Sequence, residues 1–112
     1  MYTGFWNSET RIANFACASA KDGNTKKTTE KKSARWVYPN AGGYYWAGAY
    51  VSDNFVLVGT DDGDGGYTSQ TSRLLSLSPK TGKKIDSIEG LNADIRSNVS
   101  YDKVTDRYYF TS

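Results

Sequence analysis

The sequence predicts an all-β protein made of antiparallel strands. Aromatic residues make up 14% of its 112 residues, and Gly, Ser, Thr and Asn are common between the apolar stretches. Such a composition suits half-buried pleated strands joined by tight turns. Apolar residues also alternate or run together for a few positions before a glycine or another turn former, which is typical of strands. A chain of this length fits one compact core.

Charge and composition exclude several classes of protein. Fourteen basic and twelve acidic residues leave a net charge of +2, too weak a field to attract a polyanion, so we expect no nucleic-acid partner. The sequence has no histidine, which excludes a Ser/His/Asp triad, a histidine base and an imidazole-bound metal. The single Cys17 allows no internal disulfide or cysteine-rich zinc site and is expected to be a buried thiol. No apolar run approaches the ~20 residues of a membrane-spanning helix, so we expect no membrane insertion.

Two segments near the N-terminus are predicted to be strands. The first is YTGFWNS at residues 2–8, and the second is NFACASAKDGN at residues 14–24, whose apolar residues end at a turn signal. The longer stretch NSETRIANFACASAKDG, residues 7–23, can also be written as a helix, with Ser8 as its N-cap and Gly23 as its C-terminal stop. We favour the strand because it agrees with the sequence repeat described below. The lysine-rich residues 21–33 have no apolar side chain and are expected to form a solvated loop.

A hairpin is predicted over residues 42–60. Large and small side chains alternate in GGYYWAGAYV, residues 42–51, and SDN, residues 52–54, supplies the turn. The strand FVLVGT, residues 55–60, is apolar at nearly every position, so both faces of its sheet should be covered. The preceding segment ARWVYP, residues 34–39, is expected to be a strand as well.

A second hairpin is predicted over residues 72–90. Three leucines in SRLLSL precede the type I turn signal at residues 79–82, and two isoleucines in KKIDSIEG follow it. Together the two hairpins give four sequential strands over residues 42–89. NADIRSNV, residues 92–99, also has a helical alternative, which is weaker than the one near the N-terminus.

The same order of segments recurs with an offset of about 50 residues, which is within the range of repeat architectures. YTGFWNS resembles LVGTDDG, with Gly4 in the place of Gly59, and NFACASAKDGN resembles LLSLSPKTGK. Near the C-terminus, SNVSYDKVTDRYYFTS resembles AGAYVSDNFVLVGT. We therefore expect part of one unit at residues 1–39, a complete unit at residues 42–89 and the start of a third at residues 91–112.

The glycine-ended strand, the hairpin and the aromatic strand together resemble the repeats of PQQ-like, quinoprotein-type β-propellers. Those repeats have a strand ending in a Gly-Thr-Asp-like turn, a strand ending in Asp-Pro-x-Thr-Gly-Lys, and a last strand with a tryptophan. Ser78 departs from that pattern, which has aspartate there, and the middle unit has Ile85 or Ile88 where the first has Trp36. The residues that fit the pattern are Gly59, Thr60, Asp61, Gly63, Pro79, Lys80, Thr81, Gly82, Lys83 and Trp36.

The resemblance implies four-stranded antiparallel blades that pack face to face around an axis. Propellers close with about four to eight blades, and this sequence holds one complete unit. We therefore expect the chain to be a fragment of a larger propeller, with the remaining blades in the same protein. The resemblance also leads us to expect a bacterial protein that is secreted or carried at the cell surface.

The acidic stretch at residues 61–66 has two interpretations. Asp61, Asp62 and Asp64, with the backbone carbonyls of the glycines between them, can supply oxygen ligands to a calcium ion. However, no glutamate stands at the closing position of such a loop, and the repeat already accounts for a Gly-Asp turn here. We favour the turn, keep calcium as the alternative and expect no other cofactor.

Aromatic side chains at residues 36–46 are candidates for ligand binding, because flat ring faces stack on sugars and on peptide aromatics. Core packing is the alternative, and the alternation of these residues along the strands favours it. Tyr44 and Tyr45, which lie near a turn, are the best candidates for a contact with a ligand.

Three functions from different classes are compatible with the sequence. The first, which we favour, is a non-catalytic module that acts as a scaffold or binds a protein or glycan partner through its loop-bearing rim. The second, implied by the resemblance, is a quinone-dependent dehydrogenase, for which Asp94 is the candidate catalytic carboxylate, with Arg96 beside it. The third is a small β-protein whose identical chains associate into a homo-oligomer.

Overall fold

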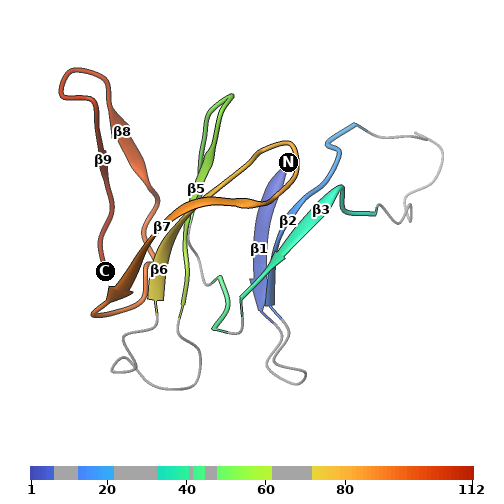
Figure 1. The fold of residues 1–112 in the computed structure, drawn as a ribbon, viewed down its shortest axis with the longest axis horizontal. Coiled ribbons are helices and arrows are strands. Elements are labelled where there is room, and N and C mark those ends of the chain that lie inside the picture. Colours follow the sequence, from blue (N-terminus) through green and yellow to red (C-terminus); the bar gives the residue numbers. More distant parts are fainter. Residues whose placement is uncertain (7–12, 22–32, 41, 45–47, 62–71) are drawn as a thin grey trace.

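The computed structural model (Figure 1) describes residues 1–6, 13–21, 33–40, 42–44, 48–61 and 72–112. These residues form nine strands and no helix. The strands lie in three sheets of three, four and two strands, and every strand pair is antiparallel. The prediction of an all-β protein with antiparallel strands is therefore confirmed.

The first sheet contains β1 (Tyr2–Trp6), β2 (Ala13–Cys17) and β3 (Trp36–Pro39), in that order. Four of the five residues of β2 are buried, which agrees with its central place in the sheet. For these residues the strand interpretation is right and the helical alternative is wrong. Ser8 and Gly23, the cap and stop of that helix, lie outside the described residues.

The second sheet contains β4 (Tyr50–Val51), β5 (Val56–Gly59), β6 (Ser72–Leu77) and β7 (Lys84–Leu91), again in sequential order. Each strand pairs with the next one along the chain. The sequence predicts four sequential strands in this part of the chain, and the structure agrees.

The first strand of this sheet is shorter than predicted. The sequence predicts a strand over residues 42–51, whereas β4 has two residues. The N–H of Gly43 donates to the carbonyl of Asn40 at 3.1 Å and closes a turn there. Tyr44 follows this turn and enters the core without belonging to a strand. Residues 45–47 lie outside the described part. Among the other residues of the predicted strand, only Tyr50 and Val51 belong to a strand, so the alternation of large and small side chains does not indicate a long strand here.

The hairpin turns lie where the sequence predicts them. In the β4–β5 turn, the Ser52 hydroxyl accepts hydrogen bonds from the N–H groups of Asn54 at 3.3 Å and Phe55 at 3.1 Å, as is common in turns. Between β6 and β7, the N–H of Gly82 donates to the carbonyl of Ser78 at 2.8 Å. This second turn is therefore one residue wider than the type I turn that the sequence predicts.

The third sheet contains β8 (Ser100–Asp102) and β9 (Arg107–Tyr109). Residues 92–99, which lead into β8, form neither helix nor strand, so the helical alternative is wrong there too. In the turn, the Asp102 carboxylate accepts from the Thr105 hydroxyl at 2.6 Å and from the Val104 N–H at 2.9 Å. These bonds, above all the one from Thr105, hold the pKa of Asp102 below its usual value.

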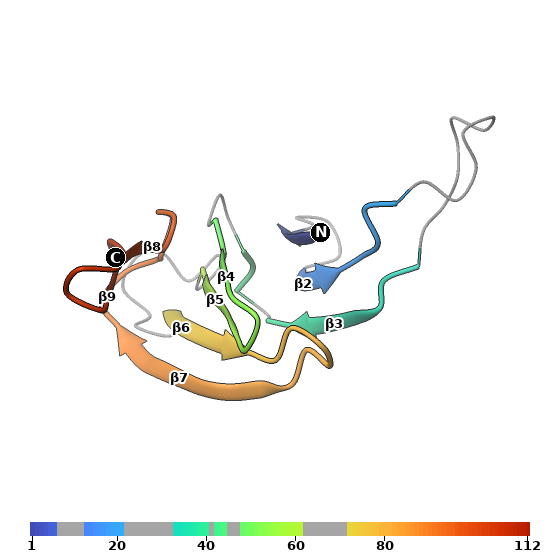
Figure 2. The ribbon, with the colours of Figure 1, turned by 90° about the horizontal axis from the view of Figure 1, so that it is seen from above.

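The second sheet lies between the other two (Figure 1, Figure 2). On β5, Val56 and Val58 are buried in the core shared with the first sheet, whereas Leu57 packs toward the third. The prediction that both faces of this strand are covered is therefore confirmed. The first core contains Phe15, Cys17, Trp36, Tyr44, Val56, Val58, Leu75 and Leu77. The second contains Leu74, Ile95 and Val99, with Tyr50, Leu57, Leu91, Tyr108 and Phe110 packed against it.

The same close approach occurs on both sides of the second sheet. Tyr44 packs against Gly4 of β1 so closely that a Cβ atom has no room at this glycine. Ile95 packs in the same way against Gly59, the last residue of β5. In each case the large side chain comes from the segment that leads into the next sheet, and the glycine lets that segment approach the strand. Gly4 and Gly59 are also the positions that the sequence repeat aligns.

Trp36 connects the first sheet to the turn between β6 and β7. Its ring N–H donates to the carbonyl of Pro79 at 3.0 Å. Gly82 lies against the same ring with a φ of +70°, and a Cβ atom on Gly82 would lie 2.5 Å from Cε3 of Trp36. Glycine is therefore required at this position both by the backbone conformation and by the contact with the ring.

Gly82→Ala is expected to lower the free energy of unfolding by about 2 kcal/mol, because the left-handed backbone costs about 1 kcal/mol and crowding against Trp36 about as much again. Gly90→Ala is the matched control, since Gly90 has a φ of +66° but no atom within 4 Å of the added carbon. Urea unfolding of the two variants separates backbone strain from crowding. Equal losses in both would contradict the contact between Gly82 and Trp36.

Candidate functional site

Polar side chains meet at one end of the second sheet. Asp94 and Arg96 come from the connection between β7 and β8, which lies in Figure 1 on the same side of the molecule as the end of β5 and the start of β6. The other members lie next to strand ends. We call the group the polar cluster, and it consists of Asn40, Asp61, Ser72, Arg73, Asp94 and Arg96.

Asp61 is buried two residues after the end of β5, with 4% of its surface exposed. Its Oδ2 atom accepts hydrogen bonds from Nη2 of Arg96 at 3.1 Å and from Nε at 3.3 Å. Its backbone N–H donates to the carbonyl of Gly43 at 3.0 Å. A buried carboxylate is costly unless it is paired, so Arg96 offsets the cost of burying this one.

Asp94 is the second buried carboxylate of the cluster. Its Oδ2 accepts from Nη2 of Arg96 at 3.0 Å, and its Oδ1 accepts from the Ser72 hydroxyl at 3.0 Å. One guanidinium therefore joins two carboxylates that lie on different segments of the chain. Because Ser72 begins β6, this network also holds the β7–β8 connection against the second sheet.

Asn40 extends the polar cluster to the end of the first sheet. Its side-chain amide donates to the backbone carbonyls of Gly43 at 3.2 Å and Asp61 at 3.3 Å. Its side-chain oxygen accepts from Nη2 of Arg73 at 3.1 Å. The cluster therefore links β3, β5, β6 and the β7–β8 connection.

The contacts of the polar cluster hold separate segments of the chain together. The Ser72 hydroxyl is fully buried and donates a hydrogen bond to Asp94, and the chain has no histidine that could act as its base. Asp94 and Arg96, the residues proposed for a quinone-dependent dehydrogenase, do lie in contact with each other. However, both carboxylate oxygens of Asp94 already accept hydrogen bonds from protein groups.

The candidate calcium ligands are placed only in part. The Asp61 carboxylate contacts the guanidinium of Arg96, whereas Asp62 and Asp64 lie outside the described residues. In the part of the chain that the structure describes, no three acidic or cysteine side chains are grouped as metal ligands. The calcium interpretation of the acidic stretch stays a prediction.

Of the two tyrosines proposed for ligand binding, Tyr44 is among the described residues and is buried. Tyr44 has 4% of its surface exposed, its ring centroid lies 5.5 Å from that of Phe15, and its hydroxyl donates to the carbonyl of Tyr38 at 3.2 Å. Its ring therefore faces the core. Tyr45 lies outside the described residues, and its role in ligand binding stays a prediction.

Tyr44 is expected to make the protein less stable with rising pH above about 10. Burial, above all, raises the pKa of Tyr44 above its ordinary value of 10.0, so the unfolded chain loses this proton first. Its contribution to stability is complete below pH 10 and is lost toward the folded-state pKa at about 1.4 kcal/mol per pH unit. Tyr44→Phe should unfold with a shallower pH dependence above pH 10. Identical slopes in the variant and the parent chain would contradict this prediction.

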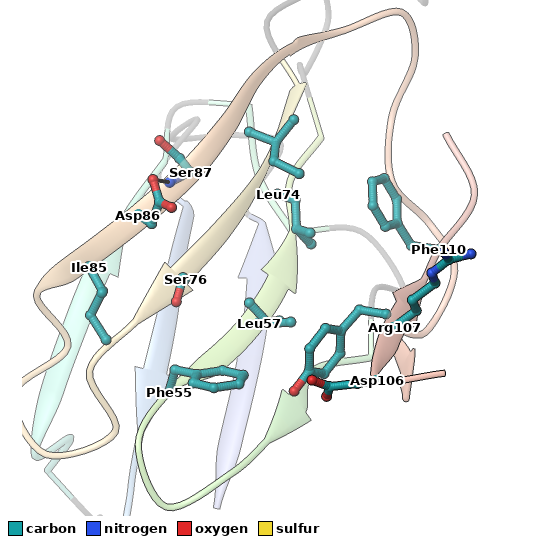
Figure 3. Close-up of a pocket in the computed structure, with 12 residues that line it drawn as sticks. Phe55, Leu57, Leu74, Ser76, Ile85, Asp86, Ser87, Asp106, Arg107 and Phe110 are labelled. Carbon is teal, nitrogen blue, oxygen red and sulfur yellow. Dashed lines mark hydrogen bonds between the residues drawn. The ribbon is translucent and has the colours of Figure 1, made fainter. Parts of the chain in front are cut away.

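A groove of about 600 Å³ lies between β9 and the face of the second sheet that is turned toward the third sheet (Figure 3). Leu57, Leu74 and Ile88 line the side that belongs to the second sheet, and Tyr108 and Phe110 line the other side. Most of its surface is therefore apolar. Asp86, Asp106 and Arg107 supply charged groups to the same groove.

Four aromatic residues, Tyr50, Phe55, Tyr101 and Tyr108, pack together beside this groove. Tyr108 lies 4.8 Å from Tyr101 and 5.1 Å from Tyr50, measured between ring centroids. The Tyr101 hydroxyl donates to Asp106 at 2.8 Å, and this bond is the main reason why the pKa of Tyr101 is raised to about 12. These contacts fix the third sheet against β4 and β5.

Sequence reasoning does not identify Asn40, Ser72 and Arg73 as members of the polar cluster. A signal for them exists, because Asn40 directly follows a predicted strand and Ser72 and Arg73 are the polar first residues of another. The pairing itself has no local signal, since Arg73 contacts a residue 33 positions away and Arg96 contacts one 35 positions away.

Comparisons with protein-family models, curated proteins and solved structures found no match to this chain. Within the residues that the structure describes, no helix has the length and apolar character to span a membrane. Fold and contacts define the chain as an all-β protein of stacked antiparallel sheets.

Proposed function

We propose that the chain is a non-catalytic module of a β-propeller, and that it serves as a scaffold or binds a protein or glycan partner. The larger protein would be a bacterial surface or secreted protein. The observation that carries the proposal is the repeated packing on the two sides of the second sheet, where Gly4 receives Tyr44 and Gly59 receives Ile95.

This repeated contact supports a stack of similar sheets. Each sheet receives a large side chain from the segment that leads into the next sheet, so a third or a fourth unit can be added by the same rule. Trp36 adds a second contact of this kind, because it lies on the last strand of the first sheet and packs on Gly82 of the following one. Gly82 and Trp36 both belong to the motifs that resemble PQQ-like repeats.

The polar cluster supports a binding or scaffolding role over a catalytic one. Asp61, Asp94 and Arg96 bind one another and hold the strand ends in place. The acidic stretch that begins at Asp61 thus starts from a fixed position at the end of β5. Loops that are carried on a rigid sheet are the usual place for partner binding.

The coding DNA on both sides of this segment tests the repeat part of the proposal. In-frame sequencing should reveal further Gly-Thr-Asp-Gly and Lys-Thr-Gly units at a spacing of about 50 residues, with a secretion signal ahead of them. Stop codons close to both ends would overturn the proposal, because four or more blades could not then belong to the same chain.

Binding is tested separately on the full-length protein, with a glycan array and with partners captured by the purified protein. Asp62→Ala combined with Asp64→Ala should abolish the binding if the acidic stretch contributes to it. Asp53→Ala is the matched control, since Asp53 is an exposed acidic residue of the β4–β5 turn. A loss of binding that is equal in the two variants would contradict a role of the acidic stretch.

A further inference from the structure

The groove beside β9 contains apolar side chains that the rest of the described chain leaves exposed. Ile85 and Ile88 of β7 are 58% and 53% exposed, although both line the groove together with buried Leu74. Leu74 lies opposite Ile88 in the β6–β7 pairing, so the two share one face of the sheet. This face is covered at Leu57 and Leu74 and left open at the two isoleucines.

The interface between the first two sheets shows what covers the equivalent face there. β6 pairs with β5 and places Leu75 and Leu77 in the core that contains Phe15 and Trp36. The leucines therefore cover the first sheet from a strand that lies one place beyond β5. The equivalent place in the third sheet is the strand position next to β9.

Among the described residues, β9 pairs with β8 alone. Its other edge therefore offers unpaired N–H and C=O groups, which can pair with an added strand. That edge borders the groove, since Arg107 and Tyr108 of β9 are among the lining residues. A strand placed there continues the interface that Tyr108 and Phe110 already make with the second sheet.

We propose that the groove binds an extended peptide strand, which pairs with the free edge of β9 and places apolar side chains over Ile85 and Ile88. Binding by strand addition obtains affinity from main-chain hydrogen bonds and specificity from pockets for alternate side chains. The groove fits a strand that has an apolar residue at every second position. The groove shares no residue with the polar cluster. The place of the added strand is taken from the first interface, so this inference rests on the repeated packing that carries the proposed function.

A synthetic peptide with the sequence of β6, SRLLSL, is the most direct probe, because β6 fills the equivalent place in the first interface. The 112-residue chain is titrated with this peptide, capped at both ends, and its amide signals are followed by NMR. We expect saturable shifts and slower amide hydrogen exchange at Arg107–Tyr109. A peptide with N-methylated amides along its pairing edge should not bind.

Ile88→Lys is the test variant, because a half-exposed side chain can change without emptying the core. We expect it to weaken peptide binding at least about 10-fold, which corresponds to 1.4 kcal/mol. Val37→Lys is the matched control, since Val37 is an apolar residue of β3 with 52% of its surface exposed and lies outside the groove. It should bind the peptide like the parent chain.

Three results would overturn the proposal. The first is the absence of saturable binding of the peptide, and the second is an equal loss of affinity in both lysine variants. The third is protection of Arg107–Tyr109 that rises with the concentration of the chain when no peptide is present. That outcome would identify a second copy of the chain as the occupant.

Discussion

Trp36→Ala is expected to lower the free energy of unfolding by about 4 kcal/mol, as is typical when a buried tryptophan is truncated. The Trp36 side chain is buried between the first sheet and the β6–β7 turn, and its ring N–H donates to Pro79 at 3.0 Å. Its ring centroid lies 5.8 Å from Tyr2 and 6.2 Å from Phe15. Truncation therefore opens a cavity in the first core and leaves the Pro79 carbonyl without this donor. Urea unfolding monitored by circular dichroism measures the loss.

Two further variants separate the causes of this loss. Trp36→Phe keeps an aromatic ring but removes the N–H group, so it should cost only about 1 to 2 kcal/mol. Phe5→Ala is the control for an aromatic residue of the same sheet that is 45% exposed, and it should cost less than about 1 kcal/mol. If Trp36→Ala cost no more than Phe5→Ala, the tryptophan would not join the first two sheets.

Arg96→Ala is expected to lower the free energy of unfolding by about 3 kcal/mol. It leaves Asp61 and Asp94 buried without the guanidinium that contacts both at 3.1 and 3.0 Å, and an uncompensated buried charge usually costs about 3 to 5 kcal/mol. The lower end of that range applies because the Arg96 side chain is itself 36% exposed. Chemical unfolding at pH 7 measures the effect.

The control for this variant is Arg35→Ala, which removes an exposed arginine directly before β3 and should change stability by less than about 0.5 kcal/mol. A double-mutant cycle isolates the pair itself. Asp61→Asn should cost much less in the Arg96→Ala background than in the parent chain, because the unpaired charge is then gone. Additive costs would mean that the two side chains do not interact in solution.

Much of the fold follows from the sequence because its causes are local. Apolar runs that end at turn residues mark the strands and their sequential order, and the continuous apolar run of β5 indicates that both its faces are covered. The length of β4 does not follow from the sequence, because the turn that Gly43 closes onto Asn40 has no signal in the alternating side chains. The choice between strand and helix at Ala13–Cys17 required the repeat as additional information.

Less of the candidate site could be predicted, because its contacts join residues far apart in the sequence. Composition excludes histidine chemistry, and the resemblance to PQQ-like repeats leads to Asp94 and Arg96 as candidates, yet neither indicates that Arg96 also binds Asp61. Tyr44 illustrates the same difficulty. The alternation of the aromatic residues favours core packing and the nearby turn favours a ligand contact; the close approach to Gly4, which has no local signal, places the Tyr44 ring in the core.

The reactivity of the Cys17 thiol can report on the interface between the first two sheets. The thiol is buried and unpaired, lies opposite Trp36 in the β2–β3 pairing and belongs to the core that both sheets share. A thiol-specific reagent in solution can reach this sulfur only while the sheets are parted. The labelling rate in the native protein thus counts spontaneous openings of this one interface, at the level of local unfolding rather than of the whole chain.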